Sequence, residues 1–219
     1  MKDTLKKLQF STDDSSVYTR PVFCIVMDGV GLAPDSAGNA VKNALTPTLD
    51  MLMKNYPTLK LKAHGTAVGL PSDDDMGNSE VGHNALGAGQ VFAQGAKLVS
   101  QSIENGSMFS SKAWKEIVSV SETGKTLHFI GLFSDGNVHS HIDHLKAMIT
   151  RAKQDGVKKV RIHALIDGRD VGETSALDYV VPFEEFLNSL RDASFDIKIA
   201  SGGGRMAITM DRYEANWSM

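Results

Sequence analysis

Four runs of apolar residues along the chain have the length of β-strands. They cover residues 21–27, 126–133, 160–166 and, with more alternation of apolar and polar positions, 195–200. A run that is apolar on both faces is typical of a strand buried in a parallel sheet, because helices cover such a sheet. The pattern therefore predicts four strands.

Apolar residues at helical spacing occupy the stretches between these runs. Thr46 and the proline after it predict a helix start. One apolar face recurs through residues 142–152 and closes at Gly156, and another spans residues 179–190, where Pro182 is expected to start or kink the helix. Strands that alternate with helices indicate an α/β fold with a largely parallel sheet.

The segment from Gly65 to Gly95 breaks this alternation. It contains seven glycines and the acidic triplet 73–75, and it shows no clear helix or strand pattern. An irregular segment of this length within a compact domain is usually functional. We therefore expect a functional loop here, and also the place where one domain gives way to the next.

The composition is that of a soluble globular protein. The chain has 219 residues, of which 42% are hydrophobic and 22% charged, and its formal net charge is −3. This length predicts one large domain or two small ones, at roughly 100–200 residues per domain. A slightly acidic chain does not favour nucleic acid as a partner. The apolar runs of about six residues are far shorter than the roughly 20 that span a bilayer, so no membrane partner is expected.

The cellular compartment follows from the single cysteine and from the first residues. Cys24 has no partner for an intrachain disulfide, which is typical of a reducing compartment. Residues 1–20 combine lysines with acidic residues and lack an apolar core, so they resemble neither a signal peptide nor a transit peptide. A cytoplasmic location is predicted.

Three predicted strands end in an Asp-Gly pair, at Asp28, Asp135 and Asp167, and a fourth ends in a run of glycines before Arg205. Ligands of open α/β sheets bind beyond the carboxyl ends of the strands. The alternative is that Asp-Gly is simply a favoured turn. Asp28 directly follows an apolar run and is suited to bind a hard metal ion, although one ligand makes no site.

Ser79 lies in a glycine-rich segment, at the start of a stretch compatible with a helix. Free backbone N–H groups and the positive end of the helix dipole would favour a phosphate on or near its oxygen. The alternative is a serine that only caps the helix. The segment is not a P-loop, because no Gly-Lys-Ser/Thr follows.

The sequence His-x-His-x-Asp-His at residues 139–144 matches the pattern of the dizinc metallo-β-lactamase-fold hydrolases. That fold needs further histidines downstream, and only His163 remains, within a predicted strand. Residues 142–152 also form a helical face, so some of these histidines line a helix start. A separate role for His139, which contacts a ligand at a strand end, does not depend on zinc.

Arginines accompany two of the strand ends. Arg169 and Asp170 follow one, and Arg205 and Arg212 follow another. Guanidinium groups that converge there are suited to bidentate binding of phosphate or carboxylate. The alternative is that they form ordinary surface salt bridges.

Six motifs occur in series along the chain. They are Met27–Gly31, Gly65–Pro71, Asp75–Gly89, Ser134–His141, Asp167–Asp170 and Gly202–Tyr213. Together they resemble the cofactor-independent (2,3-bisphosphoglycerate-independent) phosphoglycerate mutases of the alkaline phosphatase superfamily, and the resemblance runs from about Phe23 to the last residue. It implies an isomerase of glycolysis and gluconeogenesis that interconverts 3-phosphoglycerate and 2-phosphoglycerate, needs no 2,3-bisphosphoglycerate and acts as a monomer.

The resemblance also implies roles for individual residues. Ser79 takes the phosphoryl group, and Asp28 and Ser79 bind one of two Mn²⁺ ions. Asp170 lies near the substrate hydroxyls. The residues that hold the substrate are His139, Arg169, Asp170, Arg205 and Arg212.

The resemblance further implies a division of the chain. Residues 1–20 form a polar arm, residues 21–93 belong to an alkaline-phosphatase-like, metal-binding sheet domain, and residues 94–219 belong to an α/β transferase domain. Family members are more than twice as long, so we expect an N-terminal piece in which both domains are incomplete. Further metal ligands, a lysine and two arginines would lie outside it, and the stretch alone would be inactive.

Two alternatives to the mutase remain open. One is a non-catalytic module that binds a phosphorylated small acid, and the other is a related metal-dependent phosphomutase or phosphatase. The transferase residues His139, Asp170 and Arg205 count against the second. The spacing between Arg205 and Arg212 is one residue longer than in many bacterial relatives.

Overall fold

The computed structural model describes residues 23–209, which belong to two compact units that divide between Leu59 and Lys60. In the first unit, α1 spans Ala40–Asn43 and α2 spans Pro47–Asn55, and neither helix buries a side chain. The predicted helix start is confirmed, with Pro47 at the first helical position, although the Thr46 side chain makes no capping hydrogen bond. The predicted domain boundary between residues 93 and 94 stays a prediction.

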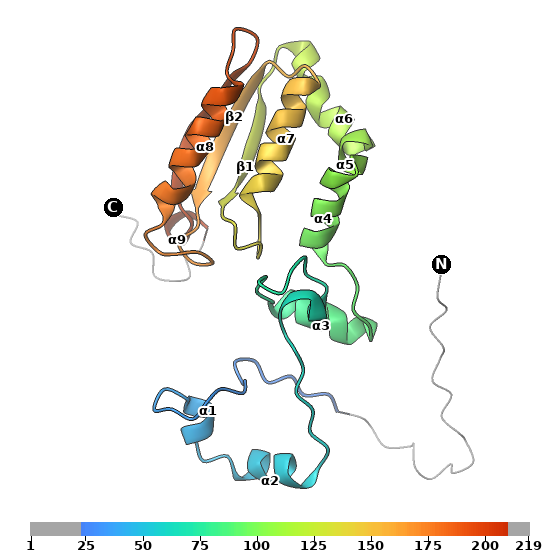
Figure 1. The fold of residues 1–219 in the computed structure, drawn as a ribbon, viewed down its shortest axis with the longest axis vertical. Helices are drawn as coiled ribbons and strands as arrows, with labels where there is room; N and C mark the ends of the chain where they lie inside the picture. The colour runs from blue at the N-terminus through green and yellow to red at the C-terminus, as the bar shows by residue number, and fades with distance from the viewer. Residues whose placement is uncertain (1–22, 210–219) are drawn as a thin grey trace, which may run out of the picture. The chain divides into compact units, whose positions relative to one another are not determined.

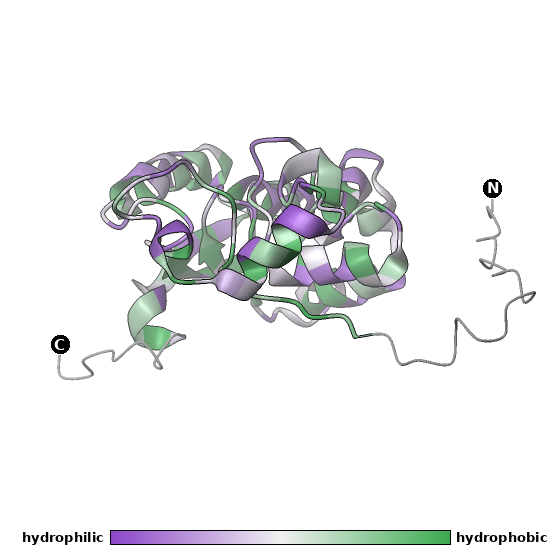
Figure 2. Ribbon diagram, turned by 90° about the horizontal axis from the view of Figure 1, so that it is seen from below, coloured by the Kyte–Doolittle hydropathy of each residue, from purple (hydrophilic) through white to green (hydrophobic). Residues whose placement is uncertain are grey.

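The apolar run predicted as the first strand is not a strand. Its described residues 23–27 have no strand assignment, and Phe23 and Ile25 are 82% and 81% exposed. In Figure 2 the run is the hydrophobic stretch next to the N-terminal grey trace. A strand needs a neighbour for its backbone N–H and C=O groups, and no described segment pairs with this one. Cys24, within the run, is an exposed free thiol.

The second unit carries the sheet. Its elements are η1 Gly65–Val68, α3 Ser79–Ala88, α4 Gly95–Glu104, α5 Ser107–Ser110, α6 Lys112–Val118, η2 Ser119–Thr123, β1 Leu127–Phe133, α7 Ile142–Gln154, β2 Lys159–Ile166, α8 Ala176–Leu190, β3 Asp196–Gly204 and α9 Arg205–Ile208. The other three predicted strands are thus confirmed as β1, β2 and β3. The segment 65–95, expected to lack regular structure, in fact contains α3, because its glycines at 82 and 87 are accommodated within a helix that Asn78 caps.

The three strands form one parallel sheet in the order β1-β2-β3. Strand β2 is central, and α7 and α8, which connect successive strands, lie on the same face of the sheet (Figure 1). Two parallel strands joined by a helix form a βαβ unit, and the chain contains two of them, β1-α7-β2 and β2-α8-β3. The α/β class with a parallel sheet is therefore as predicted. Ala200 is an extra residue in β3, since Ile162 pairs with Ile199 and His163 with Ser201.

The core lies between the sheet and these two helices. Ile149 of α7 and Phe183 and Leu187 of α8 are fully buried against β2 residues such as Val160 and Ile162. Helix α7 ends before Gly156, whose φ of +86° allows the chain to reverse. Helix α8 begins at Ala176 and continues through Pro182, so the proline does not start it. Among the described residues, no helix is both long and apolar enough to cross a membrane.

Candidate active site

The candidate site lies beyond the carboxyl ends of β2 and β3 and is built around Asp167. This residue follows β2 directly, and its side chain is fully buried. Its Oδ1 accepts hydrogen bonds from the backbone N–H groups of Arg169 and Asp170, at 3.2 and 3.1 Å. These bonds fold the loop after β2 back over the strand end.

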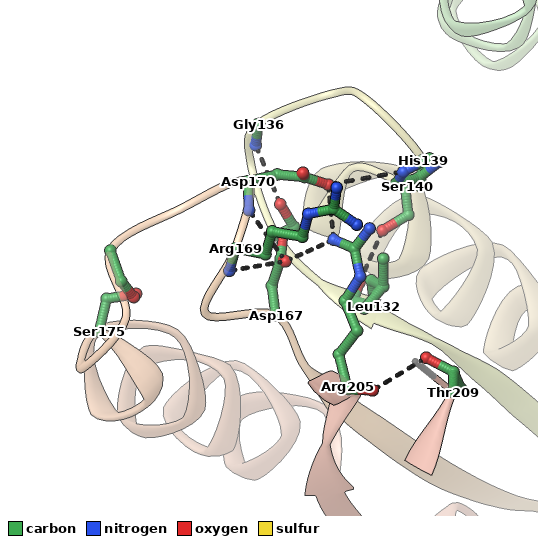
Figure 3. Close-up of polar contacts among 12 residues, drawn as sticks. Leu132, Gly136, His139, Ser140, Asp167, Arg169, Asp170, Ser175, Arg205 and Thr209 are labelled. Atoms are coloured by element: carbon green, nitrogen blue, oxygen red, sulfur yellow. Dashed lines mark hydrogen bonds and ion pairs between the residues drawn. The ribbon is translucent and has the colours of Figure 1, made fainter. Parts of the chain in front are cut away.

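Arg205 reaches the same carboxylate from the neighbouring strand end, where it is the first residue of α9. Its Nη1 donates to Asp167 Oδ1 at 2.7 Å and to Asp170 Oδ2 at 2.6 Å, and the residue is only 5% exposed (Figure 3). Among the described residues, its Nε and Nη2 have no hydrogen-bond partner. One side of the guanidinium is thus fixed by two carboxylates, while the other is available to an anion.

The ionisation states follow from this arrangement. Burial alone would raise the pKa of Asp167, but a polar contact with Ser134, the two backbone amides and Arg205 outweigh it and hold the pKa below its ordinary value. Burial alone would lower the pKa of Arg205, but its hydrogen bonds to Asp170 and Asp167 raise it. The cluster is therefore a buried ion pair that stays charged at neutral pH.

His139 and Arg169 complete the cluster. His139 Nε2 lies 3.7 Å from Asp170 Oδ2, and the His139 side chain is half exposed. Figure 3 shows Arg169 entering from the loop after β2, close to Arg205 and Asp170. Four of the five predicted substrate-holding residues, His139, Arg169, Asp170 and Arg205, are thus brought together in the structure.

These four residues line an open cavity of about 590 Å³. Its other wall comes from residues 76–78, which immediately precede Ser79, and from apolar side chains such as Leu132 and Leu165. A cavity with a few convergent charged groups on a partly apolar wall is typical of a small-molecule site.

Ser79 is the first residue of α3, and it is exposed. The capping alternative is wrong for Ser79, because the preceding Asn78 is the N-cap and its side chain accepts a hydrogen bond from Val81 N at 3.0 Å. The Ser79 hydroxyl is therefore not engaged as a helix cap. It stands at the helix end where the dipole favours a negative charge.

His83 lies one turn further along α3 and contacts Ser79 twice. Its Nδ1 is 2.7 Å from the Ser79 carbonyl oxygen and 3.3 Å from Ser79 Oγ. A carbonyl oxygen only accepts, so the 2.7 Å contact requires a hydrogen on Nδ1. This nitrogen can donate to Ser79 Oγ but cannot take its proton.

Two hydrogen bonds hold the segment before Ser79. Asn137, which follows β1 and has a φ of +56°, donates from Nδ2 to Asp75 Oδ1 at 2.8 Å. The backbone N–H of Gly77 donates to His64 Nδ1 at 2.8 Å. The first bond ties the segment to the strand-end loop that also carries His139.

The remaining predicted site residues are Arg212 and Asp28, and their predicted roles stay predictions. Arg212 lies outside the described residues. Asp28 is exposed in the first unit, where its Oδ1 accepts a hydrogen bond from Gly29 N at 3.0 Å. Its predicted partnership with Ser79 in binding a metal ion stays a prediction.

The histidine motif does not form a zinc site. His141 caps α7 by accepting from Asp143 N at 3.2 Å, and His144 Nε2 lies 2.9 Å from Ser100 Oγ. The described residues contain no group of three or more His, Cys, Asp or Glu side chains that could hold a metal ion. His163 instead lies between His128 and Ser201, on strands β1 and β3.

Sequence reasoning missed the supporting residues of this site. Asp167 was noticed only as one of several Asp-Gly strand ends, and Asp75 and Asn137 were not linked at all. These contacts join residues 35 to 62 positions apart in the chain. Local spacing carries no signal for them.

Comparison with known proteins identifies the family of the chain. Residues 99–219 match the family profile "BPG-independent PGAM N-terminus". The chain is 60% identical over 211 residues to a probable 2,3-bisphosphoglycerate-independent phosphoglycerate mutase of Leptospira interrogans, and 48% identical over 202 residues to the Trypanosoma brucei enzyme of that name. These matches cover 94% and 91% of this chain, but only 38% and 37% of the relatives.

A solved structure gives the same picture. The crystal structure of Leishmania mexicana phosphoglycerate mutase at low cobalt concentration superimposes with a TM-score of 0.77 at 48% identity, over 88% of this chain and 36% of that one. The chain thus spans little more than a third of the length of the relatives it matches. Through its sequence match to the N-terminal region, the chain belongs to the BPG-independent phosphoglycerate mutase family.

Proposed function

We propose that this chain provides the phosphoryl-accepting serine and part of the substrate site of a phosphoglycerate mutase that interconverts 3-phosphoglycerate and 2-phosphoglycerate. One observation carries the proposal. The cavity bordered by the segment before Ser79 is also lined by Arg169, Asp170, Arg205 and His139. A phosphorylated hydroxy acid presents the anionic groups and hydroxyls that such a set of side chains binds.

The chemistry is two successive phosphoryl transfers. Ser79 Oγ loses its proton and attacks the phosphorus, the P–O3 bond of the substrate breaks, and the substrate O3 takes up a proton to become a hydroxyl. The bound glycerate then reorients, its 2-hydroxyl loses its proton and attacks the phosphoserine, the P–Oγ bond breaks, and Ser79 Oγ takes up a proton. Such transfers depend mainly on positioning and electrostatic stabilisation, because little covalent work falls to the protein.

The cluster residues position the glycerate between the two transfers. The free edge of Arg205 and the Arg169 guanidinium bind its anionic groups. Asp170, whose carboxylate is 14% exposed, accepts a hydrogen bond from a substrate hydroxyl. His139 Nε2, 3.7 Å from that carboxylate, lines the same cavity.

Mn²⁺ would be held through Asp28 and Ser79. A carboxylate and a hydroxyl are oxygen ligands of the kind Mn²⁺ accepts, and the Leishmania structure was determined with cobalt present. The ion would favour the serine alkoxide and offset developing charge. Two ligands do not complete a site, however, and the described residues supply no further group. The expected count of two ions and the identity of the metal therefore rest on family membership.

We also keep as proposals the division at residue 93, a monomeric state and a cytoplasmic location. The first has support from the family profile, whose match begins at residue 99.

The test is a chimera in which this chain replaces the matching segment of the Leptospira relative. With Mn²⁺ and 3-phosphoglycerate, ³¹P NMR should show 2-phosphoglycerate. Ser79→Ala should abolish the conversion, whereas Ser107→Ala, another serine at the first position of a helix, should not affect it. Conversion by the Ser79→Ala chimera would exclude Ser79 as the nucleophile. Release of inorganic phosphate alone would favour a phosphatase, and binding without turnover would favour the non-catalytic module.

A further inference from the structure

We propose that Asp167 is a positioning residue, which holds Arg205 so that its free edge faces the substrate; this inference rests on the proposed function. Asp167 does not line the cavity itself. It acts through Arg205, and through the loop that carries Arg169 and Asp170.

The first argument is geometric. Arg205 Nη1 is fixed between Asp167 Oδ1 and Asp170 Oδ2, at 2.7 and 2.6 Å. A guanidinium is planar, so two fixed contacts on one nitrogen set the direction of Nε and Nη2. The partner in the cavity, Asp170, is itself held by Asp167 through its backbone N–H at 3.1 Å. Removal of the Asp167 carboxylate would therefore leave both the Arg205 guanidinium and the Asp170 backbone less firmly held.

The second argument concerns burial. The Asp167 side chain is fully enclosed, and among the described residues no donor meets its Oδ2 in hydrogen-bonding geometry, Ser134 making only a polar contact with the carboxylate. A buried carboxylate with an unpaired oxygen is costly to retain. A carboxamide of the same shape would avoid the charge, but its oxygen would accept only a weaker, uncharged hydrogen bond from Arg205. The arrangement fits a carboxylate whose use is to orient a cation.

The direction in which the affinity for the substrate changes distinguishes an orienting role of Asp167 from a purely electrostatic one. Removal of a negative charge beside a site for a polyanion should tighten binding by simple electrostatics. If Asp167 acts by orienting Arg205, its neutralisation should weaken binding instead. The two views predict opposite changes for the same substitution.

The experiment compares the wild-type chain with Asp167→Asn and with a matched control, Asp155→Asn. Asp155, the C-cap of α7, also accepts from an arginine, Arg151 Nε at 2.9 Å, and from Trp114 Nε1 at 2.7 Å, and it does not line the cavity. Dissociation constants for 3-phosphoglycerate are measured by calorimetry. Asp167→Asn should raise the constant about tenfold, the lower end of what loss of such a supporting partner costs in metal sites, and Asp155→Asn should not change it. An unchanged or lower constant for Asp167→Asn would overturn the proposal.

A second readout does not depend on the substrate. In the ¹⁵N-labelled chain, the ion-paired Nη1 protons of Arg205 should give resolved, slowly exchanging signals. Asp167→Asn should collapse them while the backbone amides of buried residues such as Ile149 and Val160 keep their shifts, and Asp155→Asn should leave them intact. Persistent Arg205 signals in Asp167→Asn would refute the positioning role. If the wild-type chain fails to bind 3-phosphoglycerate, the part of the substrate site that it carries is not sufficient for binding, and the NMR result alone decides the role of Asp167.

Discussion

Removal of Arg205 should destabilise the fold as well as the site, because the structure pairs this cation with two carboxylates. In Arg205→Ala, Asp167 keeps its two backbone hydrogen bonds but remains a fully enclosed anion without a cation. Breaking a buried ion pair by removing one partner costs about 3–5 kcal/mol. Because Asp170 retains some exposure, we expect Arg205→Ala to lower the free energy of unfolding by about 3 kcal/mol, the lower end of this range. That loss is a large share of the roughly 5–15 kcal/mol by which a folded domain is stable.

The pH dependence of this loss identifies its cause. In the wild type the pKa of Asp167 is held low, so its contribution to stability is present above the ordinary carboxyl pKa and is lost as the pH falls through the folded value. In Arg205→Ala burial persists without the guanidinium, so the pKa of Asp167 rises and protonation relieves the cost. The difference in unfolding free energy between the two proteins should therefore narrow as the pH falls from 7 towards 4.

Urea unfolding followed by far-ultraviolet circular dichroism, at several pH values, measures this difference. The double variant Arg205→Ala/Asp167→Asn should regain most of the loss, because the fully enclosed charge of Asp167 is gone and the remaining carboxylate, Asp170, is partly exposed. Lys112→Ala is the control, since it breaks an exposed pair with Glu116 that contributes at most about 0.5 kcal/mol. A loss below about 1 kcal/mol at pH 7, or one that does not change with pH, would refute the reasoning about an uncompensated buried charge.

Three further predictions concern packing and turns. Gly77→Ala should destabilise the chain by about 1–3 kcal/mol, because the added Cβ would lie 1.9 Å from a backbone carbonyl oxygen. Gly87→Ala, which places its Cβ in open space on α3, should instead stabilise the chain by about 0.5–1 kcal/mol. Equal effects of the two substitutions on the free energy of urea unfolding would contradict this prediction. Ile149→Val should cost about 0.5–1.5 kcal/mol in the same assay, since the residue is fully buried; no loss would mean that the site is less tightly packed. The hydrogen bond from Tyr179 to Asp135 raises the pKa of Tyr179 to about 12, so its contribution to the stability of the fold is complete below pH 10 and is lost as the pH rises through 12. On this partly exposed side chain the contribution amounts to about 1 kcal/mol after solvent screening. Tyr179→Phe should abolish this loss of stability at alkaline pH, measured as the free energy of unfolding by circular dichroism.

The sequence predicted the elements whose signal is local. β1, β2 and β3 are runs of apolar residues bounded by turns, and α7 and α8 show one apolar face each, so periodicity alone was sufficient. The run at residues 21–27 has the same local signal but no strand, because pairing depends on a neighbour that hydropathy does not reveal. Helix α3 was missed because its glycines lower helix propensity, while the cap at Asn78 supports the helix.

The sequence predicted which residues belong to the candidate site better than it predicted the contacts between them. Residue types and strand ends singled out Asp170, Arg169 and Arg205, and the structure places them together. Whether Arg205 binds an anion or forms a salt bridge was left open, and the structure shows a salt bridge on one edge with the other edge unpaired among the described residues. That distinction depends on Asp167, 38 positions earlier, and no spacing rule reaches so far.

The order of the strands has a consequence for how this part of the chain folds. Strands β2 and β3 each pair with the strand that precedes them in the chain, at a sequence separation of about 35 residues, as in Leu127 with Val160 and Val160 with Ile197. Closing a loop of that size has a moderate entropic cost, and among the described residues no strand pairs with a more distant one. The sheet can therefore grow strand by strand as the chain leaves the ribosome, and the carboxylate of Asp167 is in place before Arg205 emerges to meet it.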